Sequence, residues 1–378
     1  MSRVLLLFEY ATLNGGEQSL LALLQRLTSR GFSFHALAPG QGSLARELMV
    51  RNVEVLPLEA ISERHRSSQE ALRQQISAAI ERVRPALVHA NSLSMGRLAG
   101  PVAASASVPS VAHLRDIIRL SNQAIADLNQ NTRLLAVSQA TRDHHIAQGL
   151  CVEKVSVLYN GIDLAKFQPR PATGWLHCEL GLPRDAILIG TVGQLVLRKG
   201  HDVLAAAAQS LANHLPHAHY IIVGERYSTK AEAHEHEREV CEQSSTGQLA
   251  GRVHFLGYRA DVPSILPELT LLAHPARQEP LGRVLLEAAA TGIPIVATDV
   301  GGTAEILPPG AALLVPSDDP AALATAIRQL VDDPILRQRL AAAALERIRT
   351  TFDASTAADW LAKHYAATIS SQSDTPQA

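Results

Sequence analysis

The sequence is poor in aromatic residues and in cysteine. Of its 378 residues, 4% are Phe, Trp or Tyr, and only three are Cys. Cys151, Cys178 and Cys241 are odd in number and far apart, so the sequence suggests neither a disulfide framework nor a zinc knuckle. They indicate a reducing compartment, and we expect a cytoplasmic protein. With so few aromatics, core packing must rely on Leu, Ile, Val and Ala.

An excess of charge of either sign is also absent, as are long apolar runs. The chain has 34 Lys and Arg against 36 Asp and Glu, so it has no general attraction to nucleic acid. No stretch reaches the roughly 20 apolar residues that a membrane-spanning helix needs, so any membrane contact is expected to be peripheral. The N-terminus runs directly into the apolar stretch 4–8, and we expect no cleavable signal peptide.

Short runs of Val, Leu and Ile alternate with longer amphipathic runs, which predicts repeated β-α-β units. The strands are apolar throughout, as in parallel sheets covered by helices on both faces. The first series of predicted strands comprises residues 4–8, 32–38, 53–58, 86–90, 110–114, 134–138 and 155–159. The second series comprises residues 187–192, 220–223, 253–256, 269–273, 293–297 and 312–315. Helical runs follow at 320–331, 334–350 and 354–367.

A chain of this length with 47% apolar residues favours two domains. A Pro-rich break without periodicity begins at residue 168 and marks the boundary. The predicted divisions are an N-terminal domain, a linker, a second domain, a C-terminal helix and a disordered tail, at residues 1–168, 169–184, 185–351, 352–370 and 371–378. The predicted fold class is α/β, with two Rossmann-like doubly wound domains facing across a cleft at the carboxyl ends of their strands.

The residues 279–294 predict a loop, a helix, a turn and a strand. Pro280 suits the first turn of the helix, which places Glu279 at its mouth and Glu287 two turns inside. Eight residues of helix separate the two carboxylates by about 12 Å. The carboxylates of glycosidases lie roughly 5 to 9.5 Å apart, so a hydrolytic pair is disfavoured. Carboxylates with this spacing could accept hydrogen bonds from hydroxyls at two separate parts of one ligand. The alternative interpretation is that both are surface glutamates on an ordinary helix.

An anion would fit between these carboxylates. The amides of Leu281 and Gly282 are expected at the helix N-terminus, where backbone N–H groups bind phosphate. Arg198 and Lys199 follow the first strand of the second domain and supply the cations that a diphosphate needs. A solvated turn is the alternative for these two residues.

The ordered set of motifs resembles glycosyltransferase family 4, whose members are retaining, nucleotide-sugar-dependent enzymes of the two-Rossmann GT-B fold. Residues 275–307 resemble the donor-site signature of that family. The other matching motifs are Gly15-Gly16-Glu17, Asn160-Gly161-Ile162-Asp163, Leu197-Arg198-Lys199-Gly200, Ile221-Ile222-Val223-Gly224 and Val253-His254-Phe255-Leu256-Gly257-Tyr258. The resemblance spans almost the whole chain.

The resemblance implies roles for the matching residues of the second domain. Glu287 would bind the ribose hydroxyls of the nucleotide, Glu279 the hydroxyls of the donor sugar, and Lys199 the diphosphate. Arg198 is the candidate replacement for an arginine that many members carry at the position of Gln194. The remaining residues implied at the donor site are Gly193, Gly224, Gly257, Tyr258, Pro280, Leu281, Gly282 and Arg283.

In the first domain, the resemblance implies that His113, at the end of a strand, faces the donor sugar. Gly15, Gly16 and Glu17 would form the glycine turn after the first strand, with Gly16 close to the phosphates or the acceptor.

The resemblance also implies that the C-terminal helix crosses back to the first domain, with Trp360 and Tyr365 as apolar anchors. Together with the linker, this helix would form the hinge for closing and opening the cleft.

The implied reaction transfers a sugar from a nucleotide diphosphate sugar to a glycan, lipid-linked or small-molecule acceptor, in polysaccharide or glycolipid synthesis. The leaving diphosphate gains negative charge, which Lys199 and the helix N-terminus would stabilise. No Asp-x-Asp metal clamp is visible, so we expect neither a metal nor another cofactor. A nucleotide-sugar epimerase of the same fold and a non-catalytic sugar- or partner-binding descendant remain open as alternatives.

Weaker signals are assigned to the surface. The stretch 234–238 lacks the second histidine of a zincin helix, so a solvated helical face is expected there, as it is for His144 and His145. A third helical region of the first domain is basic and is a candidate for peripheral contact with the cytoplasmic face of a membrane. Its arginines are Arg64, Arg66, Arg73, Arg82 and Arg84.

Overall fold

The computed structural model describes residues 1–58 and 69–373, and the chain divides into two compact units. The first unit comprises Met1–Gly161 and Asp353–Ala378, and the second comprises Ile162–Phe352. The chain therefore passes between the units twice, after residue 161 and after residue 352. Arg64, Arg66 and residues 374–378 of the predicted tail lie outside the described residues.

The first boundary precedes the segment 169–184 that the sequence predicts as a linker. That segment belongs to the second unit and contains a helix, α7 (Trp175–Glu179). The carboxylate of Glu268 accepts hydrogen bonds from the backbone N–H groups of Thr173 and Gly174, both at 2.7 Å. These bonds fasten the Pro-rich stretch to the second unit, although its composition lacks any periodic signal.

The first unit is a seven-stranded parallel sheet in the order β3-β2-β1-β4-β5-β6-β7, with the register of β1 and β2 running from Ser2 opposite Phe32 to Leu7 opposite Leu37. All seven predicted strands are confirmed. The strands are β1 (Ser2–Leu7), β2 (Phe32–Pro39), β3 (Glu54–Leu58), β4 (Leu87–Ala90), β5 (Ser110–Leu114), β6 (Arg133–Ala136) and β7 (Val155–Val157). The helices are α1 (Gly15–Thr28), α2 (Ser43–Val50), α3 (Gln69–Val83), α4 (Leu93–Ser105), α5 (Asn122–Leu128), α6 (Gln139–Ile146) and α15 (Ala354–Ser373).

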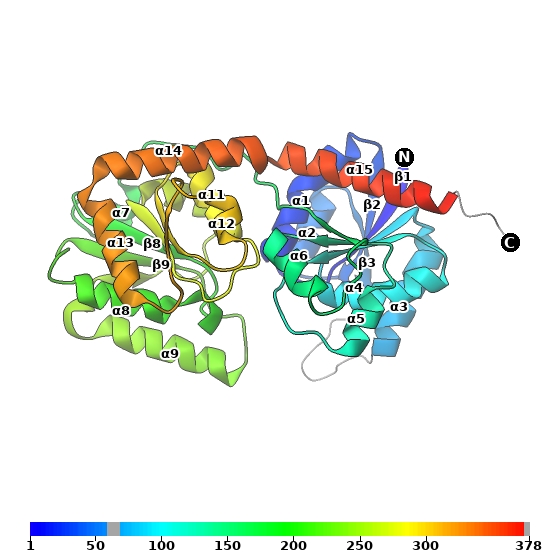
Figure 1. Cartoon of the computed structure of the whole chain (residues 1–378), viewed down its shortest axis with the longest axis horizontal. Coiled ribbons are helices and arrows are strands. Elements are labelled where there is room, and N and C mark those ends of the chain that lie inside the picture. Colours follow the sequence, from blue (N-terminus) through cyan, green and yellow to red (C-terminus); the bar gives the residue numbers. More distant parts are fainter. Residues whose placement is uncertain (59–68, 374–378) are drawn as a thin grey trace. The chain divides into compact units, whose positions relative to one another are not determined.

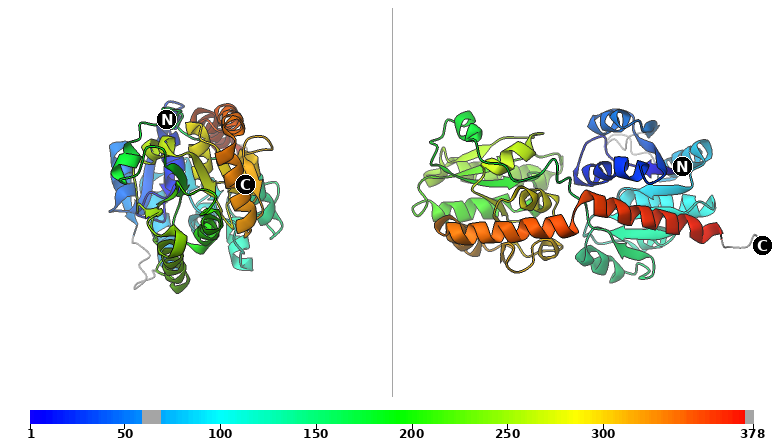
Figure 2. Two further views of the ribbon diagram at one scale, coloured as in Figure 1. Left: turned by 90° about the vertical axis from the view of Figure 1, so that its left-hand side faces the viewer. Right: turned by 90° about the horizontal axis from the view of Figure 1, so that it is seen from above.

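Both faces of the first sheet are buried, because alternate residues of each strand enter different cores. Val4 and Leu6 of β1 pack with α1 and α15, whereas Leu5 and Leu7 pack with α3 and α4. The C-terminal helix α15 thus completes the core of the first unit, and it lies alongside α1 (Figures 1 and 2). Tyr365 of α15 is fully buried there.

The second unit has a six-stranded parallel sheet in the order β10-β9-β8-β11-β12-β13, and its six predicted strands are confirmed. The strands are β8 (Ile187–Val192), β9 (Ala218–Val223), β10 (Val253–Phe255), β11 (Leu271–His274), β12 (Ile295–Thr298) and β13 (Leu313–Val315). Besides α7, the helices are α8 (His201–Leu211), α9 (Ala231–Ser245), α10 (Val262–Ile265), α11 (Arg283–Thr291), α12 (Thr303–Ile306), α13 (Pro320–Asp332) and α14 (Pro334–Thr351). The 3-10 turns are η1 (Leu197–Lys199), η2 (Gly247–Leu249) and η3 (Leu266–Glu268).

One face of the second sheet packs on α8 and α13, through side chains such as Leu204 and Ile327. Eight of the nine residues of α11 are buried. This helix packs against α14 and also contacts α12, β12 and η3. Within the described part of the chain, no helix has the length and apolar character to span a bilayer.

The basic region of the first unit is partly neutralised. Arg73 pairs with the buried carboxylate of Asp127 at 3.0 Å, and Arg82 pairs with Glu54 at 2.8 Å. Among its described members these pairs reduce the positive charge that an anionic surface would meet.

Candidate functional site

The strand order of the second unit reverses at β8 and β11, and open α/β sheets bind ligands at such a switch point. The loops that follow these two strands touch each other. Gly200 has φ of 66°, and a Cβ at this position would lie 1.9 Å from the carbonyl oxygen of Pro275. Only glycine fits here, because both the left-handed backbone and the close approach exclude a side chain.

These loops bring Lys199, Glu279 and His274 together. Lys199 Nζ forms an ion pair and a hydrogen bond with Glu279 Oε2, and His274 Nε2 lies 3.0 Å from the same oxygen. The Lys199 and Glu279 side chains are 12% and 8% exposed. Lys199 and Glu279, which the sequence assigns to different parts of a ligand, are thus in direct contact. His274 belongs to the same cluster and was not predicted from the sequence.

The cluster keeps Glu279 ionised. Burial alone would raise the pKa of Glu279, but the Lys199 charge and the His274 hydrogen bond outweigh it and hold this pKa well below its usual range. Burial lowers the pKa of His274, so its imidazole is neutral and its Nε2–H donates to the carboxylate. Burial also lowers the pKa of Lys199, against the opposing effect of Glu279.

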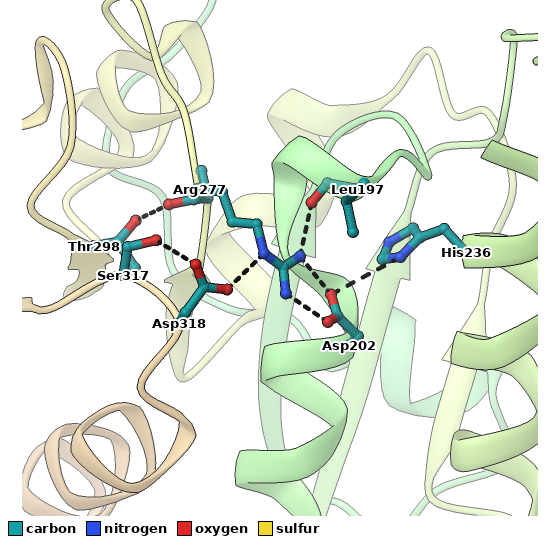
Figure 3. Close-up of polar contacts among 8 residues, drawn as sticks. Leu197, Asp202, His236, Arg277, Thr298, Ser317 and Asp318 are labelled. Atoms are coloured by element: carbon teal, nitrogen blue, oxygen red, sulfur yellow. Dashed lines mark hydrogen bonds and ion pairs between the residues drawn. The ribbon is translucent and has the colours of Figure 1, made fainter. Parts of the chain in front are cut away.

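Arg277 fixes the two loops to each other (Figure 3). Its guanidinium donates two hydrogen bonds to the carboxylate of Asp202, at 2.8 and 2.6 Å, and one to the carbonyl oxygen of Leu197 at 2.8 Å. It also donates to Asp318 at 2.5 Å, and its backbone N–H donates to the carbonyl oxygen of Arg198 at 2.8 Å. Both the side chain and the backbone of Arg277 therefore donate to carbonyl oxygens of η1.

The helix α11 begins later than the sequence predicts. Its first residue is Arg283, and its N-cap is Gly282 with φ of 103°. Pro280 therefore lies in the loop before the helix and not in its first turn. The separation of about 12 Å expected for Glu279 and Glu287 assumed one continuous helix, and that assumption is wrong.

Glu287 is buried within α11. Arg283 Nε lies 2.7 Å from Glu287 Oε1, one helical turn away. Burial raises the pKa of Glu287, while the charges of Arg283 and Lys166 act in the opposite direction. A buried carboxylate at this position is costly without a partner, and Arg283 supplies one.

The other predicted donor-site residues of the second unit lie in the segments that follow β8, β9 and β10. Gly193 and Gly224 are in contact: a Cβ on Gly224 would lie 1.9 Å from the carbonyl oxygen of Gly193. Gly224 also donates a backbone hydrogen bond to Gly257 at 2.8 Å. Tyr258 is 55% exposed, Arg198 is exposed on η1, and Gln194 is partly buried.

In the first unit, His113 is the penultimate residue of the fully buried strand β5, and it contacts two other polar side chains. His113 Nδ1 lies 2.8 Å from His89 Nε2 and 3.1 Å from a guanidinium nitrogen of Arg115. Arg115 is itself held by the backbone and side chain of Asn91, both at 2.9 Å. A Cβ on Gly16 would lie 2.9 Å from Arg115 Cδ, so this glycine makes room for the arginine.

Gly15 and Glu17 belong to the start of α1. Asn14 is the N-cap, and its backbone N–H donates to Glu17 Oε2 at 3.1 Å in a capping box. Burial raises the pKa of Glu17, which is 4% exposed. The structure thus gives Glu17 a capping role at the turn where the sequence places an acceptor or phosphate loop.

Two histidines that the sequence assigns to the surface are buried. His145 is fully buried, with Nε2 at 2.8 Å from the carbonyl oxygen of Asp116. His236 is 3% exposed and lies 3.9 Å from Asp202 (Figure 3). Helical position alone does not reveal such burial, because it depends on the neighbouring element. Across the described residues, no three or more His, Cys, Asp or Glu gather in a group that could hold a metal ion.

Family models match both halves of the chain. Residues 13–166 match the model described as "Glycosyltransferase Family 4", and residues 176–347 match "Glycosyl transferases group 1". The D-inositol 3-phosphate glycosyltransferase 1 of Catenulispora acidiphila is 31% identical over 290 residues, which cover 69% of this chain and 67% of that protein. The lipopolysaccharide core biosynthesis mannosyltransferase LpsB of Rhizobium meliloti is 32% identical over 52% of this chain and 55% of that protein. The chain thus spans between about half and two thirds of the length of these relatives.

Solved structures extend the similarity to both units. Anabaena Alr3699/HepE, solved in complex with UDP and glucose, is 25% identical with a TM-score of 0.84, and the match covers 97% of this chain and all of that chain. A sucrose-phosphate synthase from Thermosynechococcus elongatus shares the fold, with a TM-score of 0.79 over 98% of this chain and all of that chain. With its two parallel sheets of seven and six strands, the chain belongs to the group 1 glycosyltransferases of the GT-B fold.

Proposed function

We propose that this protein transfers a sugar from a nucleotide diphosphate sugar to a glycan, lipid-linked or small-molecule acceptor, with retention of the anomeric configuration. Family membership supports the reaction class, and the UDP-glucose complex of Anabaena HepE supports the donor class. The three cysteines are free thiols, which fits a reaction in the cytoplasm. Polysaccharide or glycolipid synthesis is the proposed setting.

The observation that carries the proposal is the buried Lys199–Glu279 pair at the switch point of the second unit. A lysine and an ionised glutamate in one buried spot suit a ligand that is anionic on one side and rich in hydroxyls on the other. Lys199 binds the diphosphate and Glu279 accepts hydrogen bonds from the sugar. Leu281 and Gly282 precede α11 and contribute backbone amides to the diphosphate.

The remaining roles follow from position. Glu287 accepts hydrogen bonds from the ribose, and Arg283 keeps its carboxylate paired when no ligand is bound. Arg198, exposed on η1, adds positive charge for the phosphates and offsets the uncharged Gln194. In the first unit, His113 contacts the transferred sugar.

The charges define the chemistry. As the anomeric bond breaks, the sugar becomes cationic and the diphosphate gains negative charge. Lys199 and the N-terminus of α11 stabilise the departing diphosphate, and they do so best when its charge is greatest. The acceptor attacks from the face that the diphosphate leaves, and the diphosphate takes the acceptor's proton. No covalent nucleophile and no metal ion are needed.

The proposal is tested first by thermal unfolding with a panel of UDP-, GDP-, ADP- and dTDP-sugars, since a true donor stabilises the native state by mass action. The stabilising donor is then incubated with candidate acceptors in the presence of a chelator, and NMR gives the anomeric configuration of the product. Retention without added metal is expected. An inverted product, or activity that a chelator abolishes and a divalent ion restores, would contradict the mechanism.

The ribose role of Glu287 is tested by calorimetry. Glu287→Ala should weaken binding of the nucleoside diphosphate by about 1 to 3 kcal/mol, because a charged hydrogen-bond acceptor is lost. Glu346→Ala, which removes an exposed carboxylate on α14, is the matched control and should bind as the wild type does. Equal binding by the two variants would remove the ribose assignment.

A further inference from the structure

A chain of hydrogen bonds between buried side chains links the C-terminal helix to the candidate catalytic histidine of the first unit. The hydroxyl of Tyr365 on α15 hydrogen-bonds His89 Nδ1 on β4, and His89 Nε2 lies 2.8 Å from His113 Nδ1 on β5. All three side chains are at most 2% exposed. His89 pairs with Val111 in the sheet, and His113 lies two residues further along the same face. The centroids of the two imidazole rings are therefore only 4.8 Å apart.

The donors and acceptors of this chain can be assigned in order. A guanidinium only donates, so the Arg115 nitrogen at 3.1 Å makes His113 Nδ1 an acceptor. Burial and the Arg115 charge lower the pKa of His89 to about 3 and that of His113 well below its usual range, so both rings are neutral. Neutral His113 therefore carries its proton on Nε2. His89 Nε2 donates to His113 Nδ1, which leaves His89 Nδ1 to accept from the hydroxyl of Tyr365.

The proton on His113 Nε2 lies at the open end of the chain. This nitrogen is buried and has no hydrogen-bond partner within residues 1–58 and 69–373. An unpaired buried N–H is rare in folded proteins and is costly, so each instance calls for an explanation. A ligand oxygen that occupies this position during the reaction supplies one.

We propose that Tyr365 and His89 are positioning residues that hold the His113 ring with its proton on Nε2, where it donates to an oxygen of the transferred sugar. That the partner of His113 Nε2 is a sugar oxygen rests on the proposed function. The position of the proton on the His113 ring does not depend on it. Tyr365 thus acts through its hydroxyl as well as through its ring. The ring makes an edge-on contact with the Phe32 ring, and the two ring centroids lie 5.3 Å apart. The C-terminal helix consequently contributes to the site as well as to the core.

The protonation is tested on the wild-type protein without any substrate. Selective 15N labelling of histidine distinguishes ring nitrogens that carry a proton from those that do not, and His89→Gln and His113→Gln spectra assign the signals. We expect the proton on Nε2 of both rings. A proton on Nδ1 of His113 would overturn the proposal, whatever the fate of the transferase assignment.

Tyr365→Phe tests the positioning role, because it removes the hydroxyl and keeps the ring. Turnover should fall about tenfold, as for a loss of about 1.4 kcal/mol in transition-state stabilisation, while affinity for the free nucleoside diphosphate, which lacks the sugar, stays unchanged. Thr368→Val is the matched control, because it removes another buried hydroxyl from the same helix. Wild-type turnover of Tyr365→Phe, or an equal loss in Thr368→Val, would show that the hydroxyl of Tyr365 has no positioning role.

His89 is tested by a conservative and a disruptive variant. The side-chain amide of Gln can place an N–H near the position of His89 Nε2, whereas Leu cannot donate. His89→Gln should therefore retain clearly more turnover than His89→Leu at comparable stability in urea unfolding. Equal turnover of the two variants would contradict the assigned donor.

Discussion

Lys199 and Glu279 form a buried ion pair, and both residues belong to the proposed donor site. Both side chains are largely buried, and each compensates a charge that would be costly alone. Such a pair gives little net stability compared with apolar residues of the same size, but breaking it is expensive. This energetic balance fits the proposed role of the pair in binding the donor.

Removing one partner of this pair should destabilise the second unit. Lys199→Met leaves the Glu279 carboxylate buried without its cation, and we expect a loss of about 3 to 5 kcal/mol in urea unfolding. Turnover should fall with it, because the departing diphosphate loses its counter-charge. The double variant Lys199→Met/Glu279→Leu should recover much of the stability and none of the activity. A double variant no more stable than the single one would contradict this account.

The low pKa of Glu279 predicts how its contribution to stability changes with pH. Its folded-state pKa lies below the unfolded value of about 4.3, so the ionised group stabilises the native state above that value. This contribution is lost as the pH falls towards the folded pKa. The difference in unfolding free energy between the wild type and Glu279→Gln should thus narrow from pH 6 to pH 3.5. A difference that widens on acidification would contradict the assignment.

Among the elements, the turn η1 and the loop before α11 carry the proposed donor-site residues. The proposed site requires these two segments to keep fixed positions relative to each other. Neither has regular secondary structure of any length, so tertiary contacts must hold them. Gly200 supplies the close approach, and Arg277 supplies hydrogen bonds to the backbone of η1 and to Asp202 at the start of α8. Loops positioned by a rigid scaffold in this way commonly carry binding residues.

Arg277→Gln should weaken nucleoside diphosphate binding about tenfold, because η1 loses the contacts that hold Lys199 in place. Calorimetry measures the effect. Arg259→Gln is the control: Arg259 also pairs with two carboxylates of the second unit, Glu179 and Asp261, but it contacts neither loop. We expect Arg259→Gln to bind normally, and equal weakening in both variants would indicate a general loss of stability.

At the scale of the whole molecule, the chain crosses between its units twice. The first unit therefore contains both ends of the sequence, and the second unit contains its middle. The backbone N–H of Ile162 donates to the carbonyl oxygen of Phe352 at 2.8 Å, and both residues belong to the second unit. On the other side, a Cβ on Gly161 would lie 2.6 Å from Ala354 Cα, within the first unit. The two crossings are thus adjacent.

Removing residues 353–378 should prevent the first unit from folding. The deletion exposes the apolar side chains that pack under α15 and removes Leu361 and Tyr365 from the core. Circular dichroism and limited proteolysis should show an unfolded first unit beside a folded second one. A chain ending at residue 373 keeps all of α15 and should fold and bind nucleotide as the full chain does. A stable first unit in the shorter variant would contradict the packing role of α15.

The sequence by itself determined the strands, their order along the chain and the motifs at their ends. A strand such as β1 is buried on both faces, so its composition alone identifies it. Glycines at tight turns are similarly local, as at Gly200 and Gly224. The candidate residues Lys199 and Glu279 could be found because each follows a strand, where ligand-binding loops of α/β sheets lie.

Only the tertiary structure decided which of these residues meet. Lys199 and Glu279 are 80 positions apart, and His89 and Tyr365 are 276 apart. Such contacts depend on strand order and on the face that each helix covers, neither of which periodicity specifies. The Pro-rich stretch belongs to the second unit for the same reason, since the distant Glu268 fastens it. Composition and spacing report on neighbours in the chain, whereas burial and pairing are set by neighbours in space.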